Sequence, residues 1–357
     1  MARTYDKAIV DNIERGVRHI EEDGLDIELR PIPDDDRENV LDPRVYAYAH
    51  GKLTGAVKTV AMDDVVQMRG RLNKETHPFA EGEVASSVEI ADLGDRGIPV
   101  HILRPASAKP GAPVVEYVHG GGWTFGRWEG YENALAYLAD VAGAVVVYPE
   151  YRLAPETVFP GAVDDCDGVA DWIRANAERL GVDGTKLCVM GESAGGSLTN
   201  AVVMRQMDKE PVALAVPLYA AVDSRPGIPS YWSYDLYPVI DEQRAEAKNR
   251  IDRIKDATGA AEFYTHDNVR QMADPLVSGM CASPVVLSRF PRTVVVASEY
   301  DYLRPSNEMF ARKLHEAGAD VRCIRYLGCD HGWYEAGGTM PQAEDMGRVV
   351  AGELAKL

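Results

Sequence analysis

From residue 86 onward, the spacing of apolar and polar positions switches repeatedly between the period of a strand and the period of a helix. Residues 87–90 and 100–103 alternate like two antiparallel strands around a Gly97-Ile98-Pro99 turn. Short apolar runs predict buried strands at 113–118, 144–148, 186–190, 212–218, 293–297 and 321–326. Amphipathic segments predict helices at 131–142, 163–180, 194–207 and 342–357. This alternation predicts an α/β fold with a mostly parallel sheet between two layers of helices.

The first 85 residues have a different pattern. Four apolar residues recur at helical spacing near the start of the chain: Ile9, Ile13, Val17 and Ile20. After an acidic stretch that contains prolines, a second helical pattern covers residues 57–72, and no strand-rich region is evident. We therefore predict that residues 1–85 form a helical cap segment and that residues 86–357 form the main α/β domain.

Residues 222–285 interrupt the alternation of strands and helices within that domain. They hold an aromatic cluster that consists of Tyr231, Trp232, Tyr234 and Tyr237. A highly charged helical pattern follows at 241–256. An insertion of this length usually has a role of its own, such as a lid or a pocket wall, and a solvated helical decoration is the alternative.

Composition narrows the class of protein. The 357 residues, 46% of them hydrophobic, suit one large α/β domain with insertions or two smaller domains. A net charge of −18, spread along the chain, argues against nucleic acid or an anionic membrane surface as a partner. We expect no signal peptide, because Asp11 interrupts the apolar run 8–10, and no membrane span. Five cysteines without metal-ligand spacing favour reduced thiols and a cytoplasmic location.

A Gly-x-Ser-x-Gly pattern centred on Ser193 lies between the strand predicted at 186–190 and the helix predicted at 194–207. This strand–turn–helix context is the one that a nucleophile elbow needs. Gly191 and Gly195 would leave room for the crossing backbones. Ser193 would then be exposed at the top of its strand, above the amino terminus of a helix. Alone the pattern is weak evidence, because a glycine-rich turn can contain it by chance.

A serine nucleophile requires a base, and the base requires a third group that fixes its orientation. In this fold the acid and then the histidine follow the serine, each on a loop after a strand. Asp301 and His331 follow the last two predicted strands in that order. Glu299 and Asp330 are the alternative acids, although Asp330 adjoins the base in sequence and is poorly placed to hold it.

Stabilising a tetrahedral oxyanion requires backbone N–H donors. The loop His119-Gly120-Gly121-Gly122-Trp123 follows the strand predicted at 113–118, and consecutive glycines can present amides without Cβ obstruction. The amide of Ala194, directly after the nucleophile, would be a second donor. His119 precedes the serine, which is the wrong order for the base, so we interpret it as a structural residue that holds the loop.

Together these motifs resemble those of the hormone-sensitive lipase family of α/β-hydrolases. The resemblance covers residues 86–357 and rests on ordered blocks: His119-Gly-Gly-Gly-Trp123, Tyr151-Arg-Leu-Ala-Pro-Glu156 with Phe159-Pro160 and Asp165, Gly191-Glu-Ser-Ala-Gly-Gly196, Asp301 with Leu303-Arg304, and His331-Gly332. Two departures stand out. The family's Asp-Pro-Leu-Arg-Asp-Glu-Gly run is here Asp301-Tyr-Leu-Arg-Pro-Ser-Asn307, and Glu192 replaces the commoner Asp.

The resemblance implies an α/β-hydrolase fold with an eight-stranded sheet and a cap built from residues 1–85 and 222–285. It places the oxyanion donors on Gly121, Gly122 and Ala194. It implies hydrolysis of carboxylic esters, usually with short acyl chains, and no cofactor or metal ion. Relatives often pair through the last strand and helix, so a homodimer is expected by analogy.

The expected activity is that of a serine esterase on a small-molecule ester. Ser193 would attack the carbonyl, His331 would take the proton and Asp301 would orient the imidazole. Trp123 and Trp232 are expected to line a short acyl pocket. Two alternatives stay open: an amidase or deacetylase that uses the same site, and a non-catalytic binding protein of the same fold, against which the presence of His331 argues.

Overall fold

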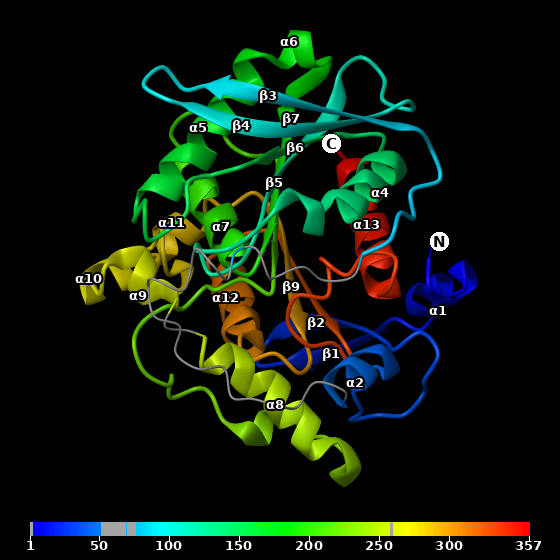
Figure 1. Cartoon of the computed structure of the whole chain (residues 1–357). Helices are drawn as coiled ribbons and strands as arrows, with labels where there is room; N and C mark the ends of the chain where they lie inside the picture. The colour runs from blue at the N-terminus through cyan, green and yellow to red at the C-terminus, as the bar shows by residue number, and fades with distance from the viewer. Residues whose placement is uncertain (1–2, 51–68, 70–75, 258–259) are drawn as a thin grey trace.

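The described part of the chain is organised around one mixed sheet of ten strands, as the computed structural model shows (Figure 1). The structure describes residues 3–50, 69, 76–257 and 260–357. The strands lie in the order β1-β2-β10-β9-β8-β7-β5-β6-β4-β3. Their bounds are β1 Arg18–Glu22, β2 Leu25–Arg30, β3 Val84–Asp92, β4 Gly97–Pro105, β5 Ala112–Val118, β6 Val145–Pro149, β7 Val182–Glu192, β8 Leu214–Leu218, β9 Arg292–Ser298 and β10 Val321–Tyr326.

The eight strands from β3 to β10 confirm the predicted α/β-hydrolase sheet. The β3–β4 and β4–β6 pairs are antiparallel, whereas the other neighbours among these eight pair in parallel. Parallel strands in this position are covered on both faces, which is why their sequences are continuous apolar runs. All five residues of β6, for example, are buried.

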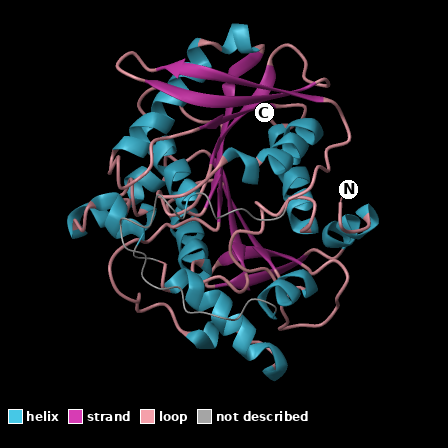
Figure 2. Ribbon diagram, viewed as in Figure 1, coloured by secondary structure: helices cyan, strands magenta, loops and turns pink. Residues whose placement is uncertain are grey.

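Helices cover both faces of this sheet (Figure 2). Helices α4 and α13 pack together on one face, and α5 packs on α7 on the other. Consecutive strand residues such as Val114 and Val115 belong to different apolar clusters, because neighbouring side chains of a strand point to opposite faces. The helices of these layers are α4 Glu132–Ala142, α5 Gly161–Ala175, α6 Ala177–Leu180, α7 Ala194–Gln206, α12 Arg304–Glu316 and α13 Pro341–Leu354.

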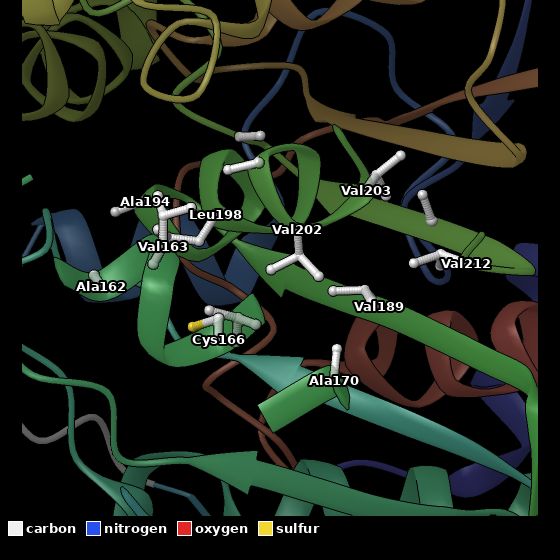
Figure 3. Packing of buried hydrophobic residues seen from close by; sticks show 14 of the residues in the cluster. Ala162, Val163, Cys166, Ala170, Val189, Ala194, Leu198, Val202, Val203 and Val212 are labelled. Carbon is white, nitrogen blue, oxygen red and sulfur yellow. The ribbon is translucent and has the colours of Figure 1, made fainter. Parts of the chain in front are cut away.

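Helix α7, which has the candidate nucleophile at its start, packs against helix α5 and strand β7 (Figure 3). Leu198 and Val202 of α7 are buried beside Val163 and Cys166 of α5 and Val189 of β7. Because both neighbours of α7 are themselves part of the core, the amino terminus of this helix is fixed relative to the end of β7.

The amino-terminal segment is not purely helical, so that part of the prediction was wrong. Helix α1, Val10–Arg15, ends at Gly16, and the chain then forms the antiparallel hairpin of β1 and β2. Asp23 and Gly24 turn between the strands with φ values of 48° and 78°. An Asp-Gly pair at positive φ is typical of a two-residue hairpin, and it outweighs the helical spacing of the apolar residues around it.

The hairpin changes which strand forms the edge of the sheet. β2 pairs in parallel with β10, with Ile27 opposite Cys323, so β10 is an interior strand. Two copies could therefore not pair strand to strand through β10, and the expected homodimer stays a prediction. The edge belongs instead to β1, whose short run Arg-His-Ile-Glu-Glu is mostly charged, a composition that discourages pairing with another sheet.

Short helices fill the insertion between β8 and β9. They are η3 Tyr234–Leu236, η4 Asp241–Gln243, α8 Arg244–Lys255, α9 Ala260–Thr265, α10 Val269–Met272, η5 Gly279–Cys281 and α11 Pro284–Leu287. Helix α2, Pro43–His50, lies against α8. The amide of Leu41 donates to Gln243 Oε1 at 2.6 Å and the amide of Ile240 to the Asn39 carbonyl at 3.0 Å. The amino-terminal segment and the insertion are thus in direct contact.

The second predicted helix, 57–72, lies outside the described residues except for Arg69. In the part of the chain that the structure does describe, no helix combines the length and the apolar character that crossing a membrane would demand.

Candidate active site

The turn between β7 and α7 has the shape of a nucleophile elbow. Ser193 adopts φ 56° and ψ −122°, a conformation that a non-glycine residue reaches only when its surroundings impose it. A Cβ added at Gly195 would lie 2.1 Å from the Val118 carbonyl oxygen, and one at Gly191 would lie 2.5 Å from the Gly195 carbonyl oxygen. Both glycines are therefore required for the backbone crossing, as the sequence predicts.

Ser193, His331 and Asp301 form a hydrogen-bonded chain. The Oγ of Ser193 is 2.9 Å from His331 Nε2, and His331 Nδ1 is 2.6 Å from Asp301 Oδ2. Asp301 is completely buried, and His331 keeps 11% of its side chain exposed. An ionised carboxylate can only accept, so Nδ1 carries the proton and Nε2 is left to accept from the serine hydroxyl.

The two alternative acids are engaged elsewhere. Glu299 Oε2 accepts a hydrogen bond from the amide of Gly328 at 2.7 Å, and burial raises the pKa of this carboxyl. Asp330 accepts from Arg250 Nε at 2.6 Å. Of the three carboxyls, Asp301 is the one that hydrogen-bonds to the ring of His331.

The glycine loop lies beside the elbow, because β5 is the neighbour of β7 in the sheet. Gly121 and Gly122 have φ values of 107° and 60°. Within residues 3–50, 69, 76–257 and 260–357, the amides of Gly121 and Gly122 have no hydrogen-bond acceptor. Ala194 is the first residue of α7, where helical amides lack a partner within the helix. These three amides are the ones that the sequence predicts as oxyanion donors.

His119 holds the glycine loop by a hydrogen bond, as predicted. Its ring is buried, stacks on Tyr151 at 4.1 Å and donates from Nδ1 to the Gly120 carbonyl at 2.7 Å. Burial lowers the pKa of His119 to about 4, so the ring is neutral near pH 7. Tyr151 in turn donates to the His119 carbonyl at 2.8 Å.

We predict that Gly121→Ala lowers kcat more than it raises KM. The new Cβ would lie 2.5 Å from the Phe125 carbonyl oxygen, so the loop must shift and move a donor. Losing one oxyanion donor costs about 3 kcal/mol in the barrier, or roughly 100-fold in kcat. Gly94→Ala is the control, since Gly94 has φ 92° and open space around it. Steady-state kinetics in which both variants lose activity equally would refute the donor role.

Trp123 and Trp232, the predicted pocket residues, are both held by aromatic neighbours from the insertion. Trp123 is 3% exposed and stacks face to face on Tyr264 of α9, with ring centroids 4.9 Å apart. Trp232 is partly buried, donates from Nε1 to the Tyr237 hydroxyl at 2.9 Å and packs against Tyr302 at 5.2 Å. Tyr302 directly follows Asp301, so this cluster adjoins the acid loop.

Several site contacts were missed at the level of sequence. Tyr219, which follows β8, is buried with its ring edge-on to His331 at 4.9 Å. Arg69 donates to the Thr124 carbonyl at 2.7 Å, just after the glycine loop, and pairs with Glu156 at 2.8 Å. Each contact joins segments far apart in the chain, and no local pattern signals them.

A cavity of about 980 Å³ is lined by the amino-terminal segment, the insertion and α12. Its lining includes Glu299, but none of the three residues of the hydrogen-bonded chain. Several charged side chains that line it form ion pairs, as Arg18 does with Glu38 at 3.1 Å and Arg325 with Glu308 at 2.6 Å. Among the described residues, no group of three or more His, Cys, Asp or Glu side chains is arranged to hold a metal ion.

Known proteins resemble this chain over most of its length. Carboxylesterase NlhH of Mycobacterium tuberculosis is 28% identical over 307 residues, which is 84% of this chain and 91% of that protein. The arylesterase of Saccharolobus solfataricus is 30% identical over 271 residues, or 74% of this chain and 80% of that protein. The chain spans 66% to 95% of the length of such curated relatives.

A solved structure and a family model also resemble this chain. A solved fungal esterase of Rhizomucor miehei superposes with a TM-score of 0.74 and 26% identity, covering 89% of this chain and 96% of that one. The family model described as the alpha/beta hydrolase fold matches residues 115–335. The chain therefore belongs to the α/β-hydrolase family, in the branch that resembles hormone-sensitive lipase.

Proposed function

We propose that the protein is a serine carboxylesterase that hydrolyses short-chain acyl esters through Ser193, His331 and Asp301. The relatives named carboxylesterase, arylesterase and ethyl acetate hydrolase support hydrolysis of carboxylic esters. The single observation that carries the mechanism is the hydrogen-bonded chain from Ser193 Oγ through the imidazole to Asp301.

The mechanism follows from the direction of these hydrogen bonds. His331 Nε2 takes the proton of Ser193 as Oγ attacks the ester carbonyl, and the imidazolium then protonates the leaving alcohol. Asp301 keeps the proton on Nδ1 and stabilises the positive ring. Amides of Gly121, Gly122 and Ala194 bind the oxyanion of the tetrahedral intermediate. Water, activated by the same imidazole, then releases the acid from Ser193.

A short acyl chain is favoured by the aromatic packing around the site. Trp123 directly follows the proposed oxyanion glycines, and its stack on Tyr264 leaves the indole unable to swing aside without breaking that contact. Trp232 is similarly tied by Tyr237 and Tyr302. We propose that these two indoles form the walls of the acyl pocket, so that chain length is limited by rings that cannot readily move.

We predict a kcat/KM that peaks between acetyl and hexanoyl p-nitrophenyl esters and falls sharply by dodecanoyl. Each methylene that fits gains roughly 0.8 kcal/mol of burial, and each that does not fit clashes with a fixed ring. A matched acetanilide series separates ester from amide hydrolysis. A rate that still rises at dodecanoyl, or activation at a lipid interface, would contradict the short pocket. Faster cleavage of the anilides would instead point to an amidase.

A further inference from the structure

A buried ion pair lies directly beside His331. Arg250, on α8 of the insertion, donates from Nε to Asp330 Oδ2 at 2.6 Å, and its Nη2 contacts the same oxygen. Both residues are only 6% exposed. Asp330 is the residue before His331, so the pair connects the insertion to the peptide that carries the imidazole.

Stability alone does not account for such a pair. The free energy lost when two charges leave water can exceed the gain from their attraction. An apolar pair of similar volume often gives the folded protein equal or greater stability. What a directional, buried pair does provide is a fixed position. Arg250 and Asp330 stand 80 residues apart in the chain, so their contact sets where α8 and the His331 loop lie relative to one another.

A second arginine of α8 reaches the same loop. Arg253 lies three residues after Arg250, on the same side of the helix, and its Nη2 is 3.5 Å from the His331 carbonyl oxygen. The same nitrogen is 4.0 Å from Asp330 Oδ2. Two guanidinium groups of one helix therefore face the two consecutive residues Asp330 and His331.

The insertion also contacts the acid loop. The hydroxyl of Tyr237 donates to the Asp301 carbonyl at 3.0 Å, and the hydroxyl of Tyr300 donates to the Pro238 carbonyl at 2.9 Å. The acid and histidine loops are themselves joined by the amide of Tyr300, which donates to the Cys329 carbonyl at 2.8 Å. Contacts from one inserted segment thus reach the loops of both His331 and Asp301.

We propose that Arg250 is a positioning residue, which holds His331 in line with Ser193 and Asp301 through its ion pair with Asp330. The proposal rests on the proposed function, because it concerns the base of that reaction. It gives residues 222–285 a role in the chemistry besides forming a wall over the substrate. A displacement of about 1 Å in a reacting group can lower a rate by roughly 100-fold, so a pair this close to the base is able to matter.

The test compares Arg250→Gln with Arg244→Gln on the same helix. Arg244 pairs with Asp241 at the surface, so it controls for the loss of an arginine from α8. With p-nitrophenyl acetate, we expect Arg250→Gln to lower kcat by about 10- to 100-fold with KM little changed, and Arg244→Gln to keep both constants. Arg250→Lys, which keeps the charge but not the planar fork, is expected to recover part of kcat.

A second readout separates positioning from mere stability. The Nδ1 proton between His331 and Asp301 gives a low-field proton resonance, which we expect to shift or broaden in Arg250→Gln and to stay in place in Arg244→Gln. If Arg250→Gln does not fold, Asp330→Asn takes its place, since the carboxamide keeps the shape and one acceptor. Wild-type kcat together with an unmoved resonance in the folded variant would overturn the positioning role.

Labelling of Ser193 in the wild-type enzyme separates the role of Arg250 from the proposed esterase activity. A wild-type enzyme that an organophosphate labels at Ser193, combined with an unaffected Arg250→Gln variant, would remove only the role of Arg250. Wild-type protein that is not labelled at Ser193, or that loses no activity in Ser193→Ala, would remove the proposed function and this inference with it.

Discussion

Ser193→Ala is expected to lower kcat/KM for a short-chain ester by roughly 10⁴-fold or more while the protein stays folded. The alanine removes the attacking oxygen, and the oxyanion amides can then accelerate only the slower attack of water. The side chain replaced is small, and among the described residues its Oγ has one hydrogen-bond partner, His331 Nε2. Steady-state kinetics measure the loss in kcat/KM, and a melting curve measures whether the variant stays folded.

Covalent labelling supplies the control for that experiment. An organophosphate should add one adduct to the wild-type chain, at Ser193, and none to Ser193→Ala. Ser288→Ala removes an exposed serine outside the site and should leave both labelling and rate unchanged. Labelling at another residue, with activity retained in Ser193→Ala, would show that the elbow does not carry the nucleophile.

Asp301→Asn is expected to be almost as damaging, with a loss of roughly 10³- to 10⁴-fold in kcat. Asp301 Oδ1 accepts from the amide of Leu303 at 3.0 Å. An asparagine must therefore direct its carboxamide oxygen toward Leu303 and its NH₂ toward His331 Nδ1. That orientation favours the proton on Nε2, and the imidazole can then no longer accept the proton of Ser193.

Two neighbouring carboxyls serve as matched controls for the acid. Glu299→Gln alters a carboxyl that bonds to Gly328, and Asp330→Asn alters one that bonds to Arg250. We expect both to retain more activity than Asp301→Asn, with Asp330→Asn the lower of the two if Arg250 positions the base. A smaller loss in Asp301→Asn than in Asp330→Asn would mean that the acid has been misassigned. Rates measured on purified variants at one pH suffice for this ranking.

The elements nearest the reacting atoms were the ones that sequence could predict. Ser193, Asp301 and His331 each follow an apolar run that predicts a strand, and the carboxyl ends of parallel strands meet at one edge of a sheet. Strand order along the chain therefore brings these residues together without any knowledge of tertiary contacts. The same reasoning placed the glycine loop, because it follows the strand beside the one that ends at Ser193.

The parts that were missed depend on contacts between distant segments. The hairpin of β1 and β2 had a local signal in Asp23-Gly24, but the helical spacing of Ile13, Val17 and Ile20 masked it. Nothing local indicates that β2 pairs with β10, since the two strands lie almost three hundred residues apart in the sequence. The Arg250–Asp330 pair also has no local signal in the sequence. The sequence of a charged helix does not indicate whether its arginines face water or a buried loop.

The pairing of β2 with β10 also has a consequence for the order of assembly. Ile27 and Cys323 are partners, so the amino-terminal hairpin leaves the ribosome almost three hundred residues before the strand that receives it. Arg30 likewise can form its hydrogen bond to Asp345, 2.8 Å long in the folded protein, only after Asp345 has been synthesised. Contacts between such distant positions are the slowest to form, because the chain must close its largest loop first. We therefore expect β2 to complete its place in the sheet only after β10 has been synthesised, late in the assembly of the described strands.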